Sequence, residues 1–249
     1  MFRKSILLFL LLSIFVFTGN AQYTPFDSWG IGLNASLYGF GVQGATTLSP
    51  NFKLRVGVDY FSYTDKESEE FDIDVIFREY EVTTQARLND TKITFPNFKA
   101  MVDYYPAANS IFSITGGLYF GNNHASTNGL IDDYEALVET LGDKPVLRFE
   151  DIVITPNDDG SFDGKLVMGN TIKPYLGIGI GRTIPRNRVG VKFELGMVYQ
   201  GKYSLSSPNI NESGNDWFDT LIEELELPFS NSLLKLWPML NLSLTYRIN

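Results

Sequence analysis

The chain's most suggestive chemical feature is a set of three glycines at every second position, Gly177, Gly179 and Gly181. Closely spaced glycines can form a phosphate-binding loop when a helix follows them, because the free N–H groups at the N-terminus of a helix bind anions. A dinucleotide loop needs the spacing G-x-G-x-x-G and a helix after it. Here the third glycine comes one residue early, and Pro185 and a further strand pattern follow. We therefore interpret these glycines as one face of a strand, where they leave room in a crowded interior.

Clustered carboxylates form a second candidate site in the segment DKESEEFDIDV, residues 65–75. Carboxylates are hard oxygen ligands, so the segment has the chemistry to bind divalent cations that bridge lipopolysaccharide phosphates. A run of like charges is more typical of a solvated surface. We therefore expect a solvated loop here, and we predict no bound metal and no other cofactor.

The only histidine, His124, lies in the segment NNHASTNGL two residues before Ser126. This segment resembles the lipid A 3-O-deacylase family, which uses a histidine and a serine two residues apart with an acid about a dozen residues further on. The resemblance implies His124 as the base, Ser126 as the nucleophile and Glu139 or Glu135 as the orienting acid. The rest of that family's surrounding motif is missing. We therefore expect a non-enzymatic protein and keep a lipid A-modifying hydrolase as an alternative.

The elements that must position these residues show a period-two alternation of apolar and polar side chains. In residues 172–181, for example, Leu176 and Ile178 fall on one face and the glycines on the other. An alternation of this length predicts strands rather than helices. Seven segments follow the pattern: residues 36–49, 51–63, 91–105, 110–122, 171–182, 188–201 and 237–248.

Three features favour a transmembrane barrel over a soluble β-sandwich, whose strands also alternate. The segments have about the length of a tilted bilayer crossing. Aromatic residues gather near segment ends, as in interfacial girdles. Tight connections alternate with long ones, which span residues 64–90, 122–170 and 202–235. We predict an all-β, antiparallel, up-and-down barrel of about eight strands, with the eighth strand within residues 23–35.

The long connections contain further elements. One expected hairpin pairs residues 79–88 with 91–95 around Asn-Asp, and another pairs residues 146–155 with 163–170 around PNDDG. We interpret both as extensions above the membrane, which leaves ten strands as the alternative count. Helix-like spacing occurs in the segments DDYEALVETLGD and DWFDTLIEELELPFSNSLLKLW, the second with Asp216 as its cap. We expect short helices that pack on the barrel rim, with docking of a partner as the alternative.

The segments KPYLGIGIG, FELGMVYQG and WPMLNLSLTYRIN look like barrel walls, and the whole chain after residue 21 resembles the small eight-stranded (OmpA- or OmpW-like) outer-membrane proteins of Gram-negative bacteria. Its last apolar residues resemble the C-terminal signature read by the barrel-assembly machinery, although Ile248 replaces the usual aromatic residue and Asn249 follows it. The resemblance implies outer-membrane lipid, lipopolysaccharide and that machinery as partners. An unidentified small ligand or protein is expected at the outer loops.

Charged residues at inward positions are the candidate site of such a barrel. An eight-stranded barrel is wide enough only to be filled by side chains or to hold one small ligand. Buried charges must be compensated, so these residues should pair with one another or with trapped water. We predict a salt-bridge plug, and a narrow anion-favouring conduit is the alternative because cations exceed acids. The predicted network comprises Lys53, Arg55, Asp59, Lys99, Asp103, Lys173, Lys192, Glu194 and Arg247.

The first 21 residues predict a cleavable signal peptide, because Arg3 and Lys4 precede an apolar run that ends before small residues. The run is too short to span a bilayer. Residues 22–249 are then expected to form a single barrel domain in the outer membrane. The formal net charge of the 249-residue chain is −9, and removal of those two cations makes it −11. An acidic exported chain is a poor partner for nucleic acid, and the absence of cysteine excludes disulfides.

Overall fold

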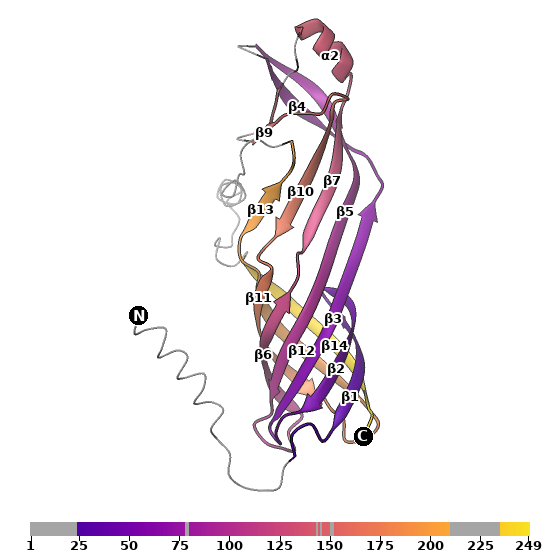
Figure 1. Ribbon diagram of the computed structural model, residues 1–249, viewed down its shortest axis with the longest axis vertical. Coiled ribbons are helices and arrows are strands. Elements are labelled where there is room, and N and C mark those ends of the chain that lie inside the picture. The colour runs from indigo at the N-terminus through magenta and orange to yellow at the C-terminus, as the bar shows by residue number, and fades with distance from the viewer. Residues whose placement is uncertain (1–23, 78–79, 143, 145, 150–151, 210–234) are drawn as a thin grey trace, which may run out of the picture.

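The protein is an eight-stranded antiparallel barrel with a sheet that continues beyond one of its ends (Figure 1). The computed structural model describes residues 24–77, 80–142, 144, 146–149, 152–209 and 235–249. The expected fold class and strand count are confirmed, and the β-sandwich alternative is wrong. Around the ring, the strands are β1 (Trp29–Ser36), β2 (Gly39–Thr47), β3 (Phe52–Asp65), β5 (Tyr80–Tyr104), β6 (Phe112–Phe120), β11 (Ile172–Gly181), β12 (Val189–Tyr199) and β14 (Leu236–Arg247).

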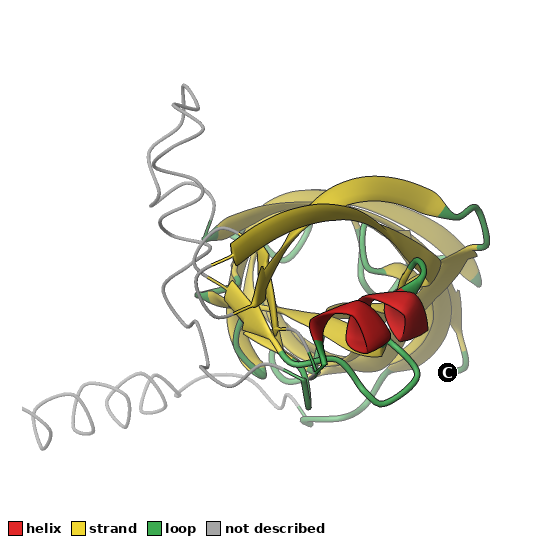
Figure 2. Cartoon of the chain, turned by 90° about the horizontal axis from the view of Figure 1, so that it is seen from above, coloured by secondary structure: helices red, strands yellow, loops and turns green. Residues whose placement is uncertain are grey.

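Pairing between β1 and β14 closes the ring, with a register that runs from Gly30 opposite Arg247 to Ser36 opposite Asn241. Viewed from above, the strands surround a single interior (Figure 2). Closure matters because a barrel without an edge satisfies all its backbone hydrogen bonds internally. We call the end of the ring at the C-terminus the inner end, and the opposite end, where β5 leaves the ring, the outer end.

The eighth strand is β1, which fills most of the stretch in which it was expected. The segment predicted as 36–49 is interrupted, because Ser36 ends β1 and a tight turn at residues 37–38 leads into β2. Gly39 opens β2 with a positive φ of 101°, and a Cβ atom there would lie 2.2 Å from the carbonyl oxygen of Tyr60. Only glycine suits this backbone conformation and this close approach.

Strand β5 is 25 residues long and connects the ring to the sheet beyond it. Its later residues pair with β6 inside the ring, whereas its earlier residues pair with other strands above it. At about 3.3 Å per residue, β5 spans about 80 Å, far more than a tilted crossing of about ten residues needs. The sheet above the ring contains β4 (Glu69–Phe77), β7 (His124–Ile131), β8 (Val146–Phe149), β9 (Ile152–Ile154), β10 (Ser161–Met168) and β13 (Tyr203–Ser206).

The hairpin expected around Asn89 and Asp90 is wrong, because β5 runs straight through these residues. Asp90 has a positive φ of 52°, and the register between β5 and β7 shifts between Asn89 and Lys92. Asn and Asp tolerate this conformation in bulges as well as in turns, so the same residues suit either element.

The hairpin expected between residues 146–155 and 163–170 is also wrong. Strand β8 pairs with β9 and β4, and β10 pairs with β7 and β13. A short helix, α2 (Tyr134–Leu141), does form in the first helix-like stretch, and it lies at the tip of the sheet (Figure 1). Most of the second helix-like stretch, with Asp216, lies outside the described residues. None of the helices in the described part of the chain has the length and apolar character to cross a membrane.

Burial in the ring is the reverse of that in a water-soluble protein. Apolar side chains on the outward face are exposed, such as Leu176 at 67% and Phe40 at 77%. Charged side chains on the inward face are almost fully buried, including Arg55 at 1% and Lys99 at 0%. Exposed tyrosines lie near both ends of the strands, such as Tyr60, Tyr63, Tyr104, Tyr199 and Tyr246. The outward face of the ring is therefore built to contact something other than water.

Three aromatic residues depart from the expected orientation and lie inside the barrel. Tyr38 has the same parity in the alternation as the outward Phe40 and Val42, but the tight turn folds it back over the interior, where it is fully buried. Tyr105 and Trp237 stand near segment ends, where the alternation predicts girdle positions. Instead, Tyr105 is buried at the inner end, and Trp237 packs against the buried aromatic cluster. Each of these residues lies at a strand end or turn, where strict alternation no longer sets side-chain direction.

Inward glycines make room for larger interior side chains, as the sequence predicted. A Cβ atom at Gly177 would lie 2.2 Å from the hydroxyl oxygen of Tyr175 and 2.8 Å from the carbonyl oxygen of Leu195. A Cβ atom at Gly196 would lie 2.5 Å from the same hydroxyl. The two glycines are paired across β11 and β12 and together accommodate the Tyr175 ring.

We predict that Gly177→Ala destabilises the folded barrel by about 1–3 kcal/mol, since it overpacks the interior against Tyr175. Denaturant titration of the protein refolded in detergent micelles would measure the change. The matched control is Gly116→Ala on the neighbouring β6, where a Cβ atom would meet nothing within 4 Å. An equal loss of stability in both variants would contradict this explanation.

Candidate functional site in the barrel lumen

Four charged side chains meet across the interior, and we call them the lumen ion cluster: Arg55, Asp103, Lys192 and Glu194. The Arg55 guanidinium binds Asp103 through Nε–Oδ2 at 2.8 Å and Nη2–Oδ1 at 2.8 Å, and Nη2 also lies 2.7 Å from Glu194 Oε2. Lys192 Nζ lies 2.8 Å from Asp103 Oδ1 and 2.8 Å from Glu194 Oε2. The residues come from β3, β5 and β12, so the cluster joins strands that are not neighbours in the ring.

Neutral donors complete the coordination of the two carboxylates. The Thr115 hydroxyl donates to Asp103 Oδ1 at 2.6 Å, and the Tyr175 hydroxyl donates to Glu194 Oε1 at 2.8 Å. The Thr183 hydroxyl donates to Asp103 Oδ2. Buried charges are tolerated only where such extra hydrogen bonds offset the loss of water. These three donors are absent from the network predicted from the sequence. Thr115 and Tyr175 stand at inward positions of the alternation, but Thr183 lies in a turn where nothing marks it.

A second ion pair lies further along the interior. Lys99 Nζ binds Asp59 through Oδ1 at 2.9 Å and Oδ2 at 3.2 Å. Asn34 Nδ2 donates to Asp59 Oδ1 at 2.7 Å. A Cβ atom at Gly41 would lie 2.2 Å from the same Asp59 oxygen, so a glycine is needed beside this pair.

Towards the outer end, aromatic and apolar side chains close the interior above the ion pairs. The rings of Tyr38 and Tyr119 meet edge to face with centroids 5.2 Å apart, and the Tyr38 hydroxyl donates to Gln200 Oε1 at 2.7 Å. T-shaped contacts of this kind are favourable in well-packed interiors. The buried cluster is formed by Tyr38, Phe95, Met101, Tyr119, Tyr175, Val198 and Met239.

Lys173 lies near the outer end and binds neutral oxygens only. Its Nζ donates to the carbonyl oxygen of Gly121 at 2.5 Å and to Asn97 Oδ1 at 3.3 Å. No salt bridge joins it to a carboxylate in the described part of the chain. The interior therefore holds one more buried cation than buried carboxylates. Its charged residues are Arg55, Lys99, Lys173 and Lys192 against Asp59, Asp103 and Glu194.

Two residues of the predicted network lie away from the lumen ion cluster. Lys53 and Arg247 stand at the inner end of β3 and β14. Lys53 Nζ donates to the carbonyl oxygen of Ser49 at 3.1 Å, and Arg247 Nε donates to the main-chain oxygen of Asn249 at 2.6 Å. Their inward positions follow the alternation, but at a strand end the side chain reaches the rim rather than the lumen.

The structure does not bring the expected catalytic residues together. His124 is the first residue of β7, and its Nδ1 lies 2.9 Å from the carbonyl oxygen of Asn122. Helix α2, which carries Glu135 and Glu139, follows the far end of β7 at Ile131. Ile131 lies seven positions after His124 along the strand, a rise of about 23 Å. Glu139 is exposed at the tip. A triad with His124 and Ser126 therefore lacks its acid.

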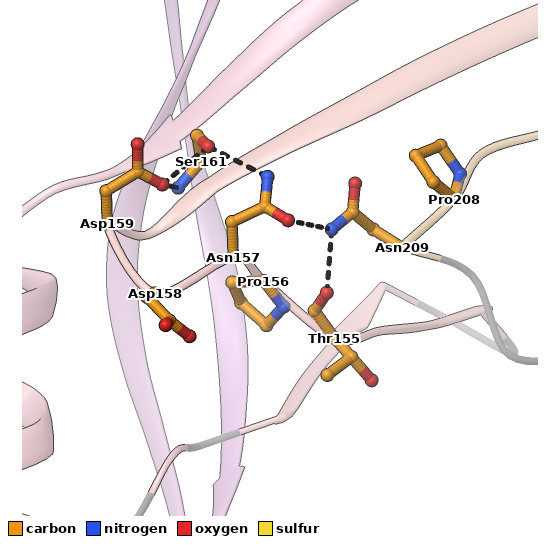
Figure 3. Close-up of a pocket in the computed structure, with 8 residues that line it drawn as sticks. All are labelled: Thr155, Pro156, Asn157, Asp158, Asp159, Ser161, Pro208 and Asn209. Atoms are coloured by element: carbon orange, nitrogen blue, oxygen red, sulfur yellow. Dashed lines mark hydrogen bonds between the residues drawn. The ribbon is translucent and has the colours of Figure 1, made fainter.

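A polar pocket of about 800 Å³ lies in the sheet above the ring (Figure 3). One wall is the loop before β10, and the other is formed by Pro208 and Asn209, about 50 residues later. Asn209 Nδ2 donates to the carbonyl oxygen of Thr155 at 2.9 Å and to Asn157 Oδ1 at 3.1 Å. Hydrogen bonds from the Ser161 hydroxyl and N–H hold the pKa of Asp159 below its usual value. The sequence predicts a hairpin turn at PNDDG, and no sequence pattern indicates the distant Asn209.

Potential metal ligands do not gather anywhere in the described ranges, where no group of three or more His, Asp or Glu side chains has suitable geometry. The acidic segment 65–75 lies on the end of β3 and on β4, and most of its side chains are outside the described ones. Among the described residues, the lumen and the polar pocket both gather polar side chains around defined contacts.

Comparisons with known proteins include two distant structural likenesses. No protein-family model matches the chain, and no curated protein matches it. The crystal structure of CarO2 from Acinetobacter baumannii superposes with a TM-score of 0.49 at 16% sequence identity, over 90% of this chain and 100% of that chain. CarO from the same organism gives a TM-score of 0.47 at 16% identity, over 91% of this chain and 99% of that chain.

We predict that Asp103→Asn lowers the free energy of unfolding by about 3–5 kcal/mol, because it leaves Arg55 and Lys192 with one shared carboxylate. The control is Arg87→Gln in the exposed pair with Asp132, where the N–O distance is 2.5 Å. That variant should keep the unfolding midpoint nearly unchanged, since exposed ion pairs contribute little. Denaturant titration in lipid vesicles measures both, and equal midpoints for Asp103→Asn and the parent would refute the role of the cluster.

Proposed function

We propose that this chain is a Gram-negative outer-membrane protein with a plugged barrel, and that its role is non-enzymatic. In this proposal the ring is an anchor, and the sheet above it is held outside the membrane for structural, adhesive or small-ligand contacts. The observation that carries the proposal is the reversed burial of the ring, with apolar residues outward and ion pairs inward. A surface of this size and character is unstable in water but is the natural surface in lipid.

The dimensions of the ring support a membrane location. Six of its strands, β1, β2, β6, β11, β12 and β14, have between 8 and 12 residues. A transmembrane strand needs about 9–11 residues at a tilt of about 45°. The exposed tyrosines near the strand ends suit the two interfaces of a bilayer. Closure between β1 and β14 removes the free edge that lipid does not tolerate.

Export is the second part of the proposal. The basic start and the apolar run in the first 21 residues support a cleavable signal peptide, although these residues lie outside the described part of the chain. Membership of the OmpA- or OmpW-like barrels, contact with lipopolysaccharide and delivery by the barrel-assembly machinery follow from the resemblance of the barrel walls and of the last strand. They are part of the same proposal.

The filled interior favours an anchor over a conduit. The lumen ion cluster binds across the barrel, and the aromatic cluster covers it on the outer side. If the interior opened, its excess of one buried cation would favour the passage of anions. Function is then expected above the ring, where the polar pocket beside Asn157 and Asn209 is open to solvent and offers amide and carboxylate groups to a small ligand.

The lipid A hydrolase is not the function we favour. Its acid, Glu139 or Glu135, lies at the tip of the sheet, and the His124 ring contacts a backbone carbonyl. Nucleophilic catalysis by Ser126 needs a base that is itself oriented by a third group. Mass analysis of lipid A with and without the protein would reveal any activity. Loss of such activity in His124→Ala would support the hydrolase alternative.

The membrane location predicts an unusual response to Leu176→Arg, in the middle of β11. If this outward position faces lipid, the substitution should lower the free energy of unfolding in vesicles by about 2–4 kcal/mol. In a water-soluble protein, a side chain that is 67% exposed would change stability by no more than about 0.5 kcal/mol. Denaturant titration of refolded protein measures the difference. A negligible change, together with recovery of the chain in the soluble periplasmic fraction without detergent, would contradict the proposal.

The plugged interior predicts electrical silence in planar bilayers. Purified protein should show no stepwise openings, since ion pairs and packed rings leave no water-filled path. Channel recordings test this, with a known porin as the positive control. Openings whose conductance changes in Arg55→Gln would originate in the lumen, and they would favour the conduit instead.

A further inference from the structure

The inner end of the barrel is strongly basic, although the chain as a whole is acidic. The turns and strand ends there carry a single acidic residue at the surface, Asp27. In the described part of the chain, Lys53, Arg182, Arg186 and Arg188 form no ion pair with an Asp or Glu side chain, and Arg247 binds the main-chain oxygen of Asn249. Arg182 and Arg186 instead contact Asn109 on the neighbouring turn. The cations are Lys53, Arg182, Arg186, Arg188 and Arg247.

An apolar groove of about 410 Å³ lies on the outward face of the ring, over the junction of β1 and β14. Its volume is within the range of ligand sites, about 300–1,000 Å³. Side chains from four adjacent strands line it, and the large ones are between about two-fifths and three-fifths exposed. The lining residues are Ile31, Gly32, Leu33, Val42, Val189, Leu244, Thr245 and Tyr246.

The groove leads to one of the basic residues. Val189 and Tyr246 line the groove towards the inner end, and Arg188 directly precedes Val189. Arg188 Nη1 donates to the Tyr246 hydroxyl at 3.0 Å, so its exposed guanidinium is held at the mouth of the groove. An apolar groove that ends at a fixed guanidinium matches a ligand with a long hydrocarbon chain and an anionic head.

We propose that this groove binds an anionic phospholipid of the leaflet at the inner end, with an acyl chain along the groove and the phosphate at Arg188. The proposal rests on the membrane location argued above and adds a specific lipid class and side. Guanidinium groups bind phosphate through paired hydrogen bonds. A zwitterionic lipid would fill the groove equally well, but it would gain less from the net positive rim.

Trp29 provides a reporter for the test. It lies two residues before Ile31 on the same outward face and is 46% exposed. A Trp217→Phe/Trp237→Phe variant leaves Trp29 as the only tryptophan. This variant is reconstituted in mixed vesicles of phosphatidylglycerol and phosphatidylcholine, with bromine on the acyl chains of one lipid at a time. Quenching of Trp29 by each brominated lipid then gives the relative occupancy of the groove.

We expect phosphatidylglycerol to be preferred by about fivefold, which is the effect of one basic residue at an anionic lipid surface. Arg188→Gln should reduce the preference to within about twofold of unity. The matched control is Arg186→Gln, which removes the same charge from the same turn but contacts Asn109 rather than the groove. Arg186→Gln should keep most of the preference, and native mass spectrometry of the chain with its own tryptophans should show the same order of lipid retention.

Two results would overturn the inference while leaving the membrane location intact. One is equal quenching by the two brominated lipids in the parent protein. The other is an equal loss of preference in Arg188→Gln and Arg186→Gln, which would indicate a diffuse charge effect without a bound lipid. Absence of quenching by either lipid would mean that the ring does not enter the bilayer, and the proposed function would fail with the inference.

Discussion

The structure depends on one constraint, which is that a ring of eight strands encloses an interior too narrow to stay hydrated. Every charge that the alternation directs inward must then find a partner inside the ring. Arg55 and Lys192 satisfy this requirement by sharing Asp103 and Glu194, and hydroxyl groups donate further hydrogen bonds to the two carboxylates. Because β12 is not a neighbour of β3 or β5 in the ring, the ion pairs to Lys192 and Glu194 also brace the barrel across its interior. The same narrowness explains the inward glycines, since Tyr175 occupies the space that side chains at Gly177 and Gly196 would need.

The sheet above the ring is joined to the barrel through one long strand. Strand β5 passes from the barrel into this sheet without a break, so the outer part of the sheet is continuous with the ring. Backbone pairing between β5, β7, β10 and β13 extends the sheet beyond the outer end of the ring. In the proposed function, this outer part of the sheet is the platform for contacts beyond the membrane surface. The polar pocket and the short helix α2 are both built on this platform.

The two ends of the molecule also differ in charge. The inner rim carries five cations and one surface acid, whereas the acidic segment 65–75 begins at Asp65, the last residue of β3, beyond the outer end of the ring. If the groove beside Arg188 holds an anionic lipid, the barrel has a chemical preference for the leaflet at its inner end that is independent of its loops. The closed lumen and the asymmetric rim both support the proposed role of an anchor with a defined orientation.

The sequence by itself determined which face of each strand meets the surroundings, because side chains alternate with a period of two and this property is local. It therefore predicted the outward apolar band, the inward position of Arg55, Asp103, Lys192 and Glu194, and the need for inward glycines. Only the tertiary structure decided which of those charges meet, because contact across the lumen depends on the register of every strand in the closed ring. It also decided what alternation cannot reach, namely residues at turns and strand ends. Tyr38 folds inward, Asp90 forms a bulge rather than a hairpin, and β7 separates His124 from Glu139 by its own length. The groove ending at Arg188 arises in the same way, since its walls come from strands that meet only when the first and last close the ring.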